Sequence, residues 1–387
     1  MKQFNYLILG FLSMSLAFTS CKKNNDADNN DNGDTTPMYT VPDTYSFEDA
    51  NGNSTVSFSG QTQRKDMLAE ITSYMKDGND GIYVDAQQLK NMYANIGYTW
   101  LQDGSDPDDL GGNLNESSKQ LRNKTANGRA DEVEVVGYFE DLMDGLSSAS
   151  GGGPDGVILS DYLQSESTGK EWVQLIEKGL MGACFYHNIS EYYLGASKMD
   201  VDNSTAVDPD AGKYYTDMEH HWDEAYGYFT DQIDYDPNAD SKRFWGKYAG
   251  GSREDFLGTA TAVSEAFRTG RAAISANDMD TRDQQISVVR EQMELVVGGT
   301  AIYYLNKALN DIASGADVGV KNHHLAEAEA FIHGLMFGGE ASFSKSEVEG
   351  MMNAMSNYNT LGPDDITSVR NQIADGLNIS DSNRDNL

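Results

Sequence analysis

The sequence predicts an all-α protein, a multi-helix bundle with a small β-hairpin near its N-terminus. Three observations support this class. From about residue 60 onward, apolar residues recur at spacings of three and four, the spacing of one helical face. Short stretches rich in Gly, Asn and Asp separate these periodic segments. After residue 60, no alternation of apolar and polar residues is long enough to build a large sheet.

The N-terminus has the features of an export signal. Lys2 precedes an apolar run from residue 6 to residue 18, and two small residues then lead to Cys21. The run is too short to span a bilayer as a lone helix, and its pattern is typical of a secretory signal peptide. A small residue just before a cysteine resembles the lipobox of bacterial lipoproteins. The resemblance implies that residues 1–20 are removed and that Cys21 carries the lipid.

Residues 21–43 are predicted to form a lipidated, flexible tether, because residues 22–37 contain a single apolar side chain. Acidic residues soon after a lipidated cysteine resemble export tags of some Gram-negative bacteria. We therefore expect an outer-membrane lipoprotein, and the sequence leaves open whether it faces the periplasm or the outside. The lipid would be its membrane contact. With Cys21 lipidated, Cys184 has no partner for an internal disulfide.

The net charge of −33 excludes one class of partner and favours another. Nucleic acid requires a basic surface to bind its phosphates, so no nucleic-acid partner is expected. An acidic protein attracts cations, although the charge also serves solubility alone. The sequence does not set the oligomeric state.

The first part of the folded chain is predicted to cover residues 44–150. Apolar and polar residues alternate between residues 39 and 60 around an Asn-Gly-Asn turn, which predicts the hairpin. Helical periodicity then begins at Met67 and returns at Leu89. A loop is expected over residues 97–115, and a further helix over residues 131–146.

Residues 151–387 are predicted to form the main bundle, after a Gly- and Ser-rich break over residues 147–156. Two of its helices should begin with cap signals, a Ser before Glu near residue 344 and a Pro before acids near residue 362. The other helices are expected at about 169–198, 213–230, 253–276, 280–313 and 323–338.

All six histidines fall in three clusters on predicted helices, and each cluster contains carboxylates at helical spacing. Such pairs from several helices can bind a transition metal at one point. They are also ordinary helix pairs that contribute about 0.2–0.5 kcal/mol. His220 and His323 are predicted to be surface neighbours, about 100° around the helix from His221 and His324. The candidate metal ligands are the three pairs His187 with Glu191, His221 with Glu224, and Glu329 with His333; a fourth pairing is His324 with Glu327.

The stretch YHNISEYYLG around His187 resembles the imelysin signature, in which Gly-x-His-x-x-Glu runs into an apolar segment that ends in Gly. Two positions depart from it: Phe185 replaces the Gly, and Glu191 follows His187 by four residues instead of three. The resemblance implies an exported all-α protein linked to iron uptake, with the His and Glu as candidate ligands. An older peptidase label on that family would imply proteolysis.

Over its whole length the chain is more similar to an uncharacterised family of imelysin-associated Gram-negative lipoproteins. Three sequence stretches carry this similarity: TYSFE, SGQTQRKDMLAEITSYMK and MEHHWDEAYGYF. It implies a fold and a compartment without an established activity.

These observations lead to two functional hypotheses. The first is a lipid-anchored binding protein that captures a transition metal for an outer-membrane uptake receptor; iron is favoured, and zinc and copper accept the same ligands. The second is a surface lipoprotein that binds glycan or protein, with structural histidines and with Trp100 and Trp245 as contacts. A metallopeptidase is not favoured, because no HExxH motif occurs. Calcium is not expected either, since the acidic loop from Asp200 lacks the Gly and Glu of an EF-hand.

Overall fold

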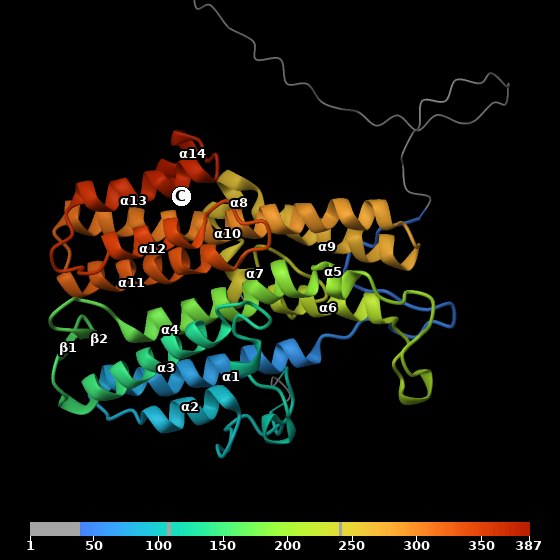
Figure 1. Ribbon diagram of the computed structural model, residues 1–387, viewed down its shortest axis with the longest axis horizontal. Helices are drawn as coiled ribbons and strands as arrows, with labels where there is room; N and C mark the ends of the chain where they lie inside the picture. The colour runs from blue at the N-terminus through green and yellow to red at the C-terminus, as the bar shows by residue number, and fades with distance from the viewer. Residues whose placement is uncertain (1–38, 107–109, 240–241) are drawn as a thin grey trace, which may run out of the picture. The chain divides into compact units, whose positions relative to one another are not determined.

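Helices build most of the protein, as the computed structural model shows (Figure 1). The structure describes residues 39–106, 110–239 and 242–387. Within these residues Tyr39–Leu387 forms one compact unit, and the predicted all-α class is confirmed. The predicted signal peptide, Cys21 and the tether up to residue 38 lie outside the described residues and stay predictions. None of the described helices is long and apolar enough to cross a membrane.

Four kinds of secondary structure occur in the described residues: α-helices, 3₁₀ turns, π-helical segments and strands. The α-helices are α1 (Ser59–Lys76), α2 (Ala86–Ala94), α3 (Glu132–Ala149), α4 (Trp172–Leu180), α5 (Ala196–Met199), α6 (Asp217–Phe229), α7 (Phe244–Tyr248), α8 (Ser252–Leu257), α9 (Thr259–Ser275), α10 (Met279–Ser314), α11 (Val318–Gly334), α12 (Lys345–Ala354), α13 (Pro363–Gly376) and α14 (Asp381–Asn386). The 3₁₀ turns are η1 (Asp77–Asp80), η2 (Leu114–Glu116), η3 (Arg122–Lys124), η4 (Ser150–Gly152), η7 (Pro209–Ala211) and η8 (Leu335–Phe337); η5 (Met181–Tyr186) and η6 (Asn188–Tyr193) are π-helical. The strands are β1 (Gly156–Leu159) and β2 (Tyr162–Ser165).

Several helix ends follow from local chemistry. Ser344 and Glu347 form a capping box at α12, as the sequence predicts. The segment 253–276, predicted as one helix, is instead split into α8 and α9. Gly258 lies between them with a φ of 70°, a left-handed conformation that ends a helix and suits glycine. The predicted helix 169–198 likewise divides into α4, η5, η6 and α5.

The hairpin predicted over residues 39–60 is present only as a minimal antiparallel turn around the predicted Asn-Gly-Asn segment. In the segment 39–60 the backbone makes a single antiparallel bridge, between Glu48 and Ser54. Two side chains of this segment bind helices instead, because Tyr45 donates a hydrogen bond to Asp223 of α6 and Thr55 accepts one from Arg271 of α9. Strand pairing in the segment is limited to this bridge, and the helices hold its other residues in place.

The two-stranded sheet lies at β1 and β2, which pair antiparallel from Gly156 with Ser165 to Leu159 with Tyr162. Two residues join the strands, Ser160 and Asp161, and both have positive φ values, 51° and 66°. This is the geometry of the tight turns that favour hairpins. The predicted break over residues 147–156 thus leads directly into the sheet.

The long helix α10 is central to the packing of the second half. It packs against α9, α11 and α13, and α11 packs in turn against α4. The helices on either side of the Gly-rich break also contact each other, since α3 packs on α4 and α1 on α6 (Figure 1). Where η5 crosses α11, a Cβ on Gly182 would lie 2.7 Å from the Cα of Gly334, so the two backbones touch.

Candidate functional site

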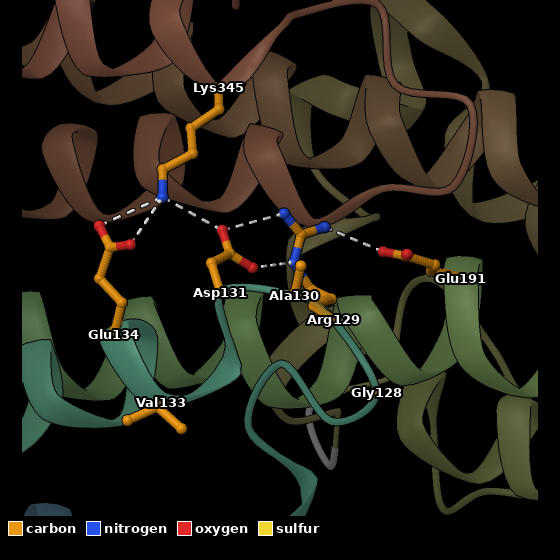
Figure 2. Close-up of a pocket in the computed structure, with 8 residues that line it drawn as sticks. All are labelled: Gly128, Arg129, Ala130, Asp131, Val133, Glu134, Glu191 and Lys345. Atoms are coloured by element: carbon orange, nitrogen blue, oxygen red, sulfur yellow. Dashed lines mark hydrogen bonds and ion pairs between the residues drawn. The ribbon is translucent and has the colours of Figure 1, made fainter.

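The candidate site is an open cleft of about 820 Å³ in which three distant segments meet (Figure 2). The loop before α3 and the first turn of α3 form one wall. The exposed side of η6 and the first residue of α12 supply the rest. The lining residues are Gly128, Arg129, Ala130, Asp131, Val133, Glu134, Glu191 and Lys345.

Charged side chains of alternating sign run along this cleft. Arg129 donates from Nε to Asp131 Oδ1 over 2.9 Å and from Nη1 to Glu191 Oε2 over 3.0 Å. Lys345 Nζ lies 3.2 Å from both Asp131 Oδ2 and Glu134 Oε1. Three carboxylates and two cations give the chain of five a net charge of −1. The contacts with His187 and Arg129 outweigh the effect of burial and lower the pKa of Glu191.

His187 contacts the lining residue Glu191 but does not line the cleft itself, and it is only 1 % exposed. Its Nε2 is 2.9 Å from the carbonyl oxygen of Asn127, which can only accept, so Nε2 carries a proton. Its Nδ1 is 3.3 Å from Glu191 Oε2. A metal would require Nδ1 without its proton, and an imidazole nitrogen next to a carboxylate oxygen is a donor set that transition metals accept.

The backbone around His187 has an unusual form. The residue lies between the π-helical segments η5 and η6, which continue α4. The π-helix is rare and appears frequently at functional sites, because its i to i+5 hydrogen bonds re-aim side chains relative to an α-helix. Here it holds the ring of His187 and the carboxylate of Glu191 in contact across a spacing of four.

The second predicted pair lies on α6 and turns toward other partners. His221 Nδ1 is 2.9 Å from the carbonyl oxygen of Lys198, and burial lowers its pKa. Glu224 Oε1 accepts hydrogen bonds from Gln61 and from the hydroxyl of Tyr193, each over 3.0 Å. Tyr193 belongs to η6, so this pair neighbours the first, but it does not join it in one set of ligands.

The third predicted pair is buried in α11, and its two members have separate surroundings. Glu329 accepts hydrogen bonds from Lys170 and from the hydroxyl of Tyr358, each over 2.6 Å. His333 lies among aromatic rings, 4.8 Å from Tyr138 and 5.0 Å from Phe337 between centroids. Among the described residues, no group of three or more His, Cys, Asp or Glu side chains is placed to hold a metal ion. A metal-binding role for the six residues stays a prediction.

Comparison with known protein families identifies the family of this chain. The family model described as "Domain of unknown function (DUF4856)" matches residues 42–379. The chain belongs to this family. The match includes the whole cleft, from Gly128 to Lys345. No curated protein and no solved structure matches the chain. The similarity to an uncharacterised family is thus confirmed, and kinship with imelysins stays a prediction.

His323 is not the surface residue that the sequence predicts. Its Nδ1 is 2.6 Å from Glu171 Oε2, its Nε2 is 3.4 Å from Glu327 Oε2, and its ring stacks on Tyr162 at 4.0 Å. The predicted pairing of His324 with Glu327 is also wrong, because His324 bonds to an acid of α10. The i, i+4 spacing of His323 and Glu327 was the signal that could have found this contact.

Stability should therefore depend on the protonation of His323. Burial opposes its charge, but Glu171 and Glu327 outweigh burial and raise its pKa. A basic group whose pKa is raised by folding stabilises the fold at pH values below its unfolded-state pKa. This contribution is lost as the pH rises through its folded-state pKa. Urea unfolding of the wild type and of His323→Gln at about pH 5.5 and about pH 8 measures this. We expect stability to fall less between the two pH values in the variant; an equal fall in both proteins would contradict the prediction.

The structure also removes two residues from the glycan hypothesis. Trp100 and Trp245, the predicted sugar contacts, are 2 % and 0 % exposed. Trp100 Nε1 donates to Asn95, and Trp245 Nε1 donates to the carbonyl of Met181. Cys184 is a free, buried thiol, and burial raises its pKa to about 12.

Proposed function

We propose that this protein is a lipid-anchored binding protein of the Gram-negative cell envelope that captures a transition-metal cation, iron in the first place, for an outer-membrane uptake receptor. The observation that carries the proposal is the position of Arg129. Its guanidinium lies between the carboxylates of Glu191 and Asp131, and Glu191 also contacts the His187 ring. A cation thus already occupies the place where acids and an imidazole meet.

The residues carry donor atoms that metal ions accept, and these side chains would have to close around the ion once Arg129 has left its place. Asp131 and Glu191 offer oxygen donors, and His187 offers an Nδ1 whose partner nitrogen is fixed by the Asn127 carbonyl. A backbone acceptor on the second nitrogen is the usual way in which proteins orient a ligating imidazole. The metal would replace the guanidinium, which borders the open cleft and can turn into it. The net negative charge of the cleft would favour this exchange.

The spacing of four between His187 and Glu191 is compatible with the imelysin resemblance. A π-helix closes each turn one residue later than an α-helix, so one inserted residue still leaves the two side chains on the same face. The contact of 3.3 Å between them shows this face in the present chain. The resemblance supports iron as the metal to test first.

Two substitutions in the cleft test the proposal by moving metal affinity in opposite directions. Glu191→Gln should weaken binding of Fe²⁺ or Zn²⁺ at least about tenfold, since it removes a charged donor worth about 1.4 kcal/mol or more. Arg129→Ala should strengthen binding, because it removes the competing cation. Anaerobic isothermal titration with each ion, followed by elemental analysis after dialysis, measures both effects.

Glu140→Gln is the matched control, since Glu140 lies on α3, pairs with Arg122 at the surface and is outside the cleft. We expect it to bind metal as the wild type does. Absence of binding in the wild type, or weaker binding in Arg129→Ala, would overturn the proposal. The second result would instead indicate a ligand that carries negative charge.

A further inference from the structure

A second pocket, smaller and more enclosed, adjoins the cleft. Its volume is about 180 Å³, and it shares Glu134 and Lys345 with the cleft. These two side chains are paired with each other over 3.2 Å, so their ion pair lies at the border between the two cavities. The remaining lining residues are Val135, Tyr138, His333, Met336, Glu349 and Met352.

His333 lines this pocket beside the apolar side chains Val135, Met336 and Met352, while the charged side chains Glu134, Glu349 and Lys345 form the rest of the lining with Tyr138. His333 is 6 % exposed, and its Nδ1 has no hydrogen-bond partner among the residues that the structure describes. Burial, together with the nearby Lys345, lowers its pKa to about 4, so the ring is neutral at physiological pH. A buried nitrogen without a partner costs free energy, and a ligand that supplies the missing hydrogen bond would recover it.

We propose that this pocket binds a small aromatic molecule with one hydroxyl group, which hydrogen-bonds to the His333 imidazole. The volume of the pocket, about 180 Å³, supports a small aromatic ligand, because an apolar cavity of about 150 Å³ holds benzene. The walls support it too: the Met336 and Met352 thioethers make favourable contacts with ring edges, and Tyr138 offers an aromatic face.

A neutral ligand fits better than a charged one. The charged groups at the rim are already paired, since Lys345 lies 3.2 Å from Asp131 and Glu134 and 3.9 Å from Glu349. A charged ligand would therefore lose its hydration in the apolar interior without gaining a free partner. This inference does not rest on the metal proposal, because its ligand is organic and its key residue, His333, lies outside the cleft.

Binding of p-cresol, with toluene as the analogue that lacks the hydroxyl, tests this inference on the whole chain. Methyl-¹³C methionine labelling allows NMR to report on the pocket, with Met336→Leu and Met352→Leu to assign the signals. We expect p-cresol to shift the Met336 and Met352 signals and to leave that of Met67, which lies in α1, unchanged. Toluene should bind about tenfold more weakly, the value of one hydrogen bond.

Two variants assign the binding to this pocket. Val135→Trp fills the cavity and should abolish the shifts. His333→Phe keeps a ring but removes the hydrogen bond, so p-cresol and toluene should bind it equally. The inference is overturned if p-cresol leaves both methionine signals in place, if toluene binds the wild type as tightly as p-cresol, or if Val135→Trp binds p-cresol unchanged. The toluene comparison uses the native protein and holds even if a variant fails to fold.

Discussion

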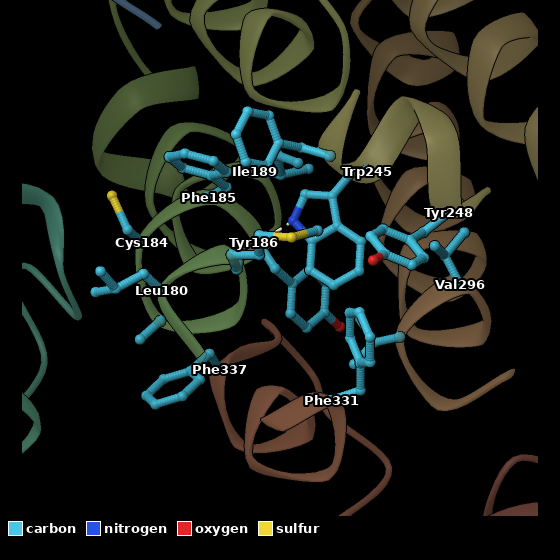
Figure 3. Close-up of a cluster of buried hydrophobic side chains, with 14 of the residues drawn as sticks. Leu180, Cys184, Phe185, Tyr186, Ile189, Trp245, Tyr248, Val296, Phe331 and Phe337 are labelled. Carbon is cyan, nitrogen blue, oxygen red and sulfur yellow. Dashed lines mark hydrogen bonds between the residues drawn. The ribbon is translucent and has the colours of Figure 1, made fainter. Parts of the chain in front are cut away.

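Replacing Trp245 with alanine is expected to lower the free energy of unfolding by about 3–5 kcal/mol. Trp245 is fully buried at the centre of an aromatic cluster (Figure 3). Its ring centroid lies 5.8 Å from that of Phe331 in α11, and 6.2 Å from that of Tyr186 in η5. The side chain therefore joins α7 to both of these elements, and truncation leaves a cavity that none of them can fill alone.

The indole also has a polar role. Its Nε1 donates to the carbonyl of Met181 over 3.0 Å, within the π-helical stretch. Trp245→Phe keeps most of the ring packing and loses this bond, so we expect a smaller cost of about 1–3 kcal/mol. Urea unfolding followed by far-ultraviolet circular dichroism compares the two variants. A cost for Trp245→Ala no larger than that for Trp245→Phe would contradict the assigned packing role.

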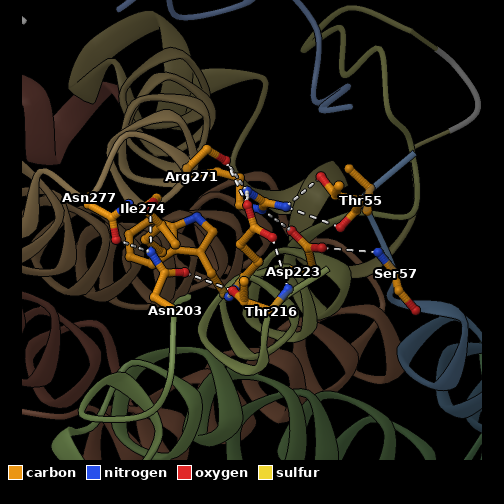
Figure 4. Close-up of polar contacts among 12 residues, drawn as sticks. Thr55, Ser57, Asn203, Thr216, Asp223, Arg271, Ile274 and Asn277 are labelled. Atoms are coloured by element: carbon orange, nitrogen blue, oxygen red, sulfur yellow. Dashed lines mark hydrogen bonds and ion pairs between the residues drawn. The ribbon is translucent and has the colours of Figure 1, made fainter. Parts of the chain in front are cut away.

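Replacing Arg271 with alanine should cost a similar amount, about 3–5 kcal/mol, because it leaves buried carboxylates without their counter-charge. Arg271 is fully buried and binds Asp223 Oδ1 over 2.9 Å and Glu219 Oε1 over 2.6 Å (Figure 4). It also donates to the carbonyl and the hydroxyl of Thr55. Asp223 accepts in addition from the backbone of Ser57, so α6, α9 and the N-terminal segment share one network.

The loss in Arg271→Ala should grow with pH. Burial raises the pKa of Asp223 to about 6 even beside the guanidinium, and removal of Arg271 raises it further. A carboxyl group whose pKa is raised by folding contributes less to stability as pH rises. The free energy of unfolding of the variant should therefore be lowest above neutral pH. Arg122→Ala is the control, since Arg122 pairs with Glu140 at the surface and should cost less than about 1 kcal/mol. An equal loss of unfolding free energy in Arg271→Ala and Arg122→Ala would contradict the stabilising role of the buried network.

Periodicity predicted most of the helices because their buried faces repeat in the chain itself. α10 illustrates this, since the predicted segment 280–313 and the observed Met279–Ser314 nearly coincide. Breaks were harder to place. Gly258 is one glycine among many, and its role in dividing α8 from α9 depends on its backbone conformation. The hairpin was predicted to be longer than it is, because alternation at residues 39–60 also reflects contacts with helices, which local sequence does not distinguish from strand pairing.

The site was less predictable than the fold. His187 and Glu191 were visible as a pair because they are four residues apart. The residues that surround this pair could not be predicted. Arg129 comes from a loop that precedes α3, and Lys345 comes from the start of α12, more than two hundred residues later. His323 was missed for the same reason, because one of its acids, Glu171, belongs to the segment before α4. Tertiary contacts of this kind leave no spacing in the sequence.

The π-helical stretch makes the meeting of His187 and Glu191 tolerant of a change in chain length. Deleting one residue between them would let the backbone settle into the ordinary α form, and the resulting spacing of three would still leave the two side chains as neighbours on one face. The helices before and after could keep their own packing. Evolution could thus change the spacing of this pair by a single-codon insertion or deletion, without redesign of the rest of the molecule.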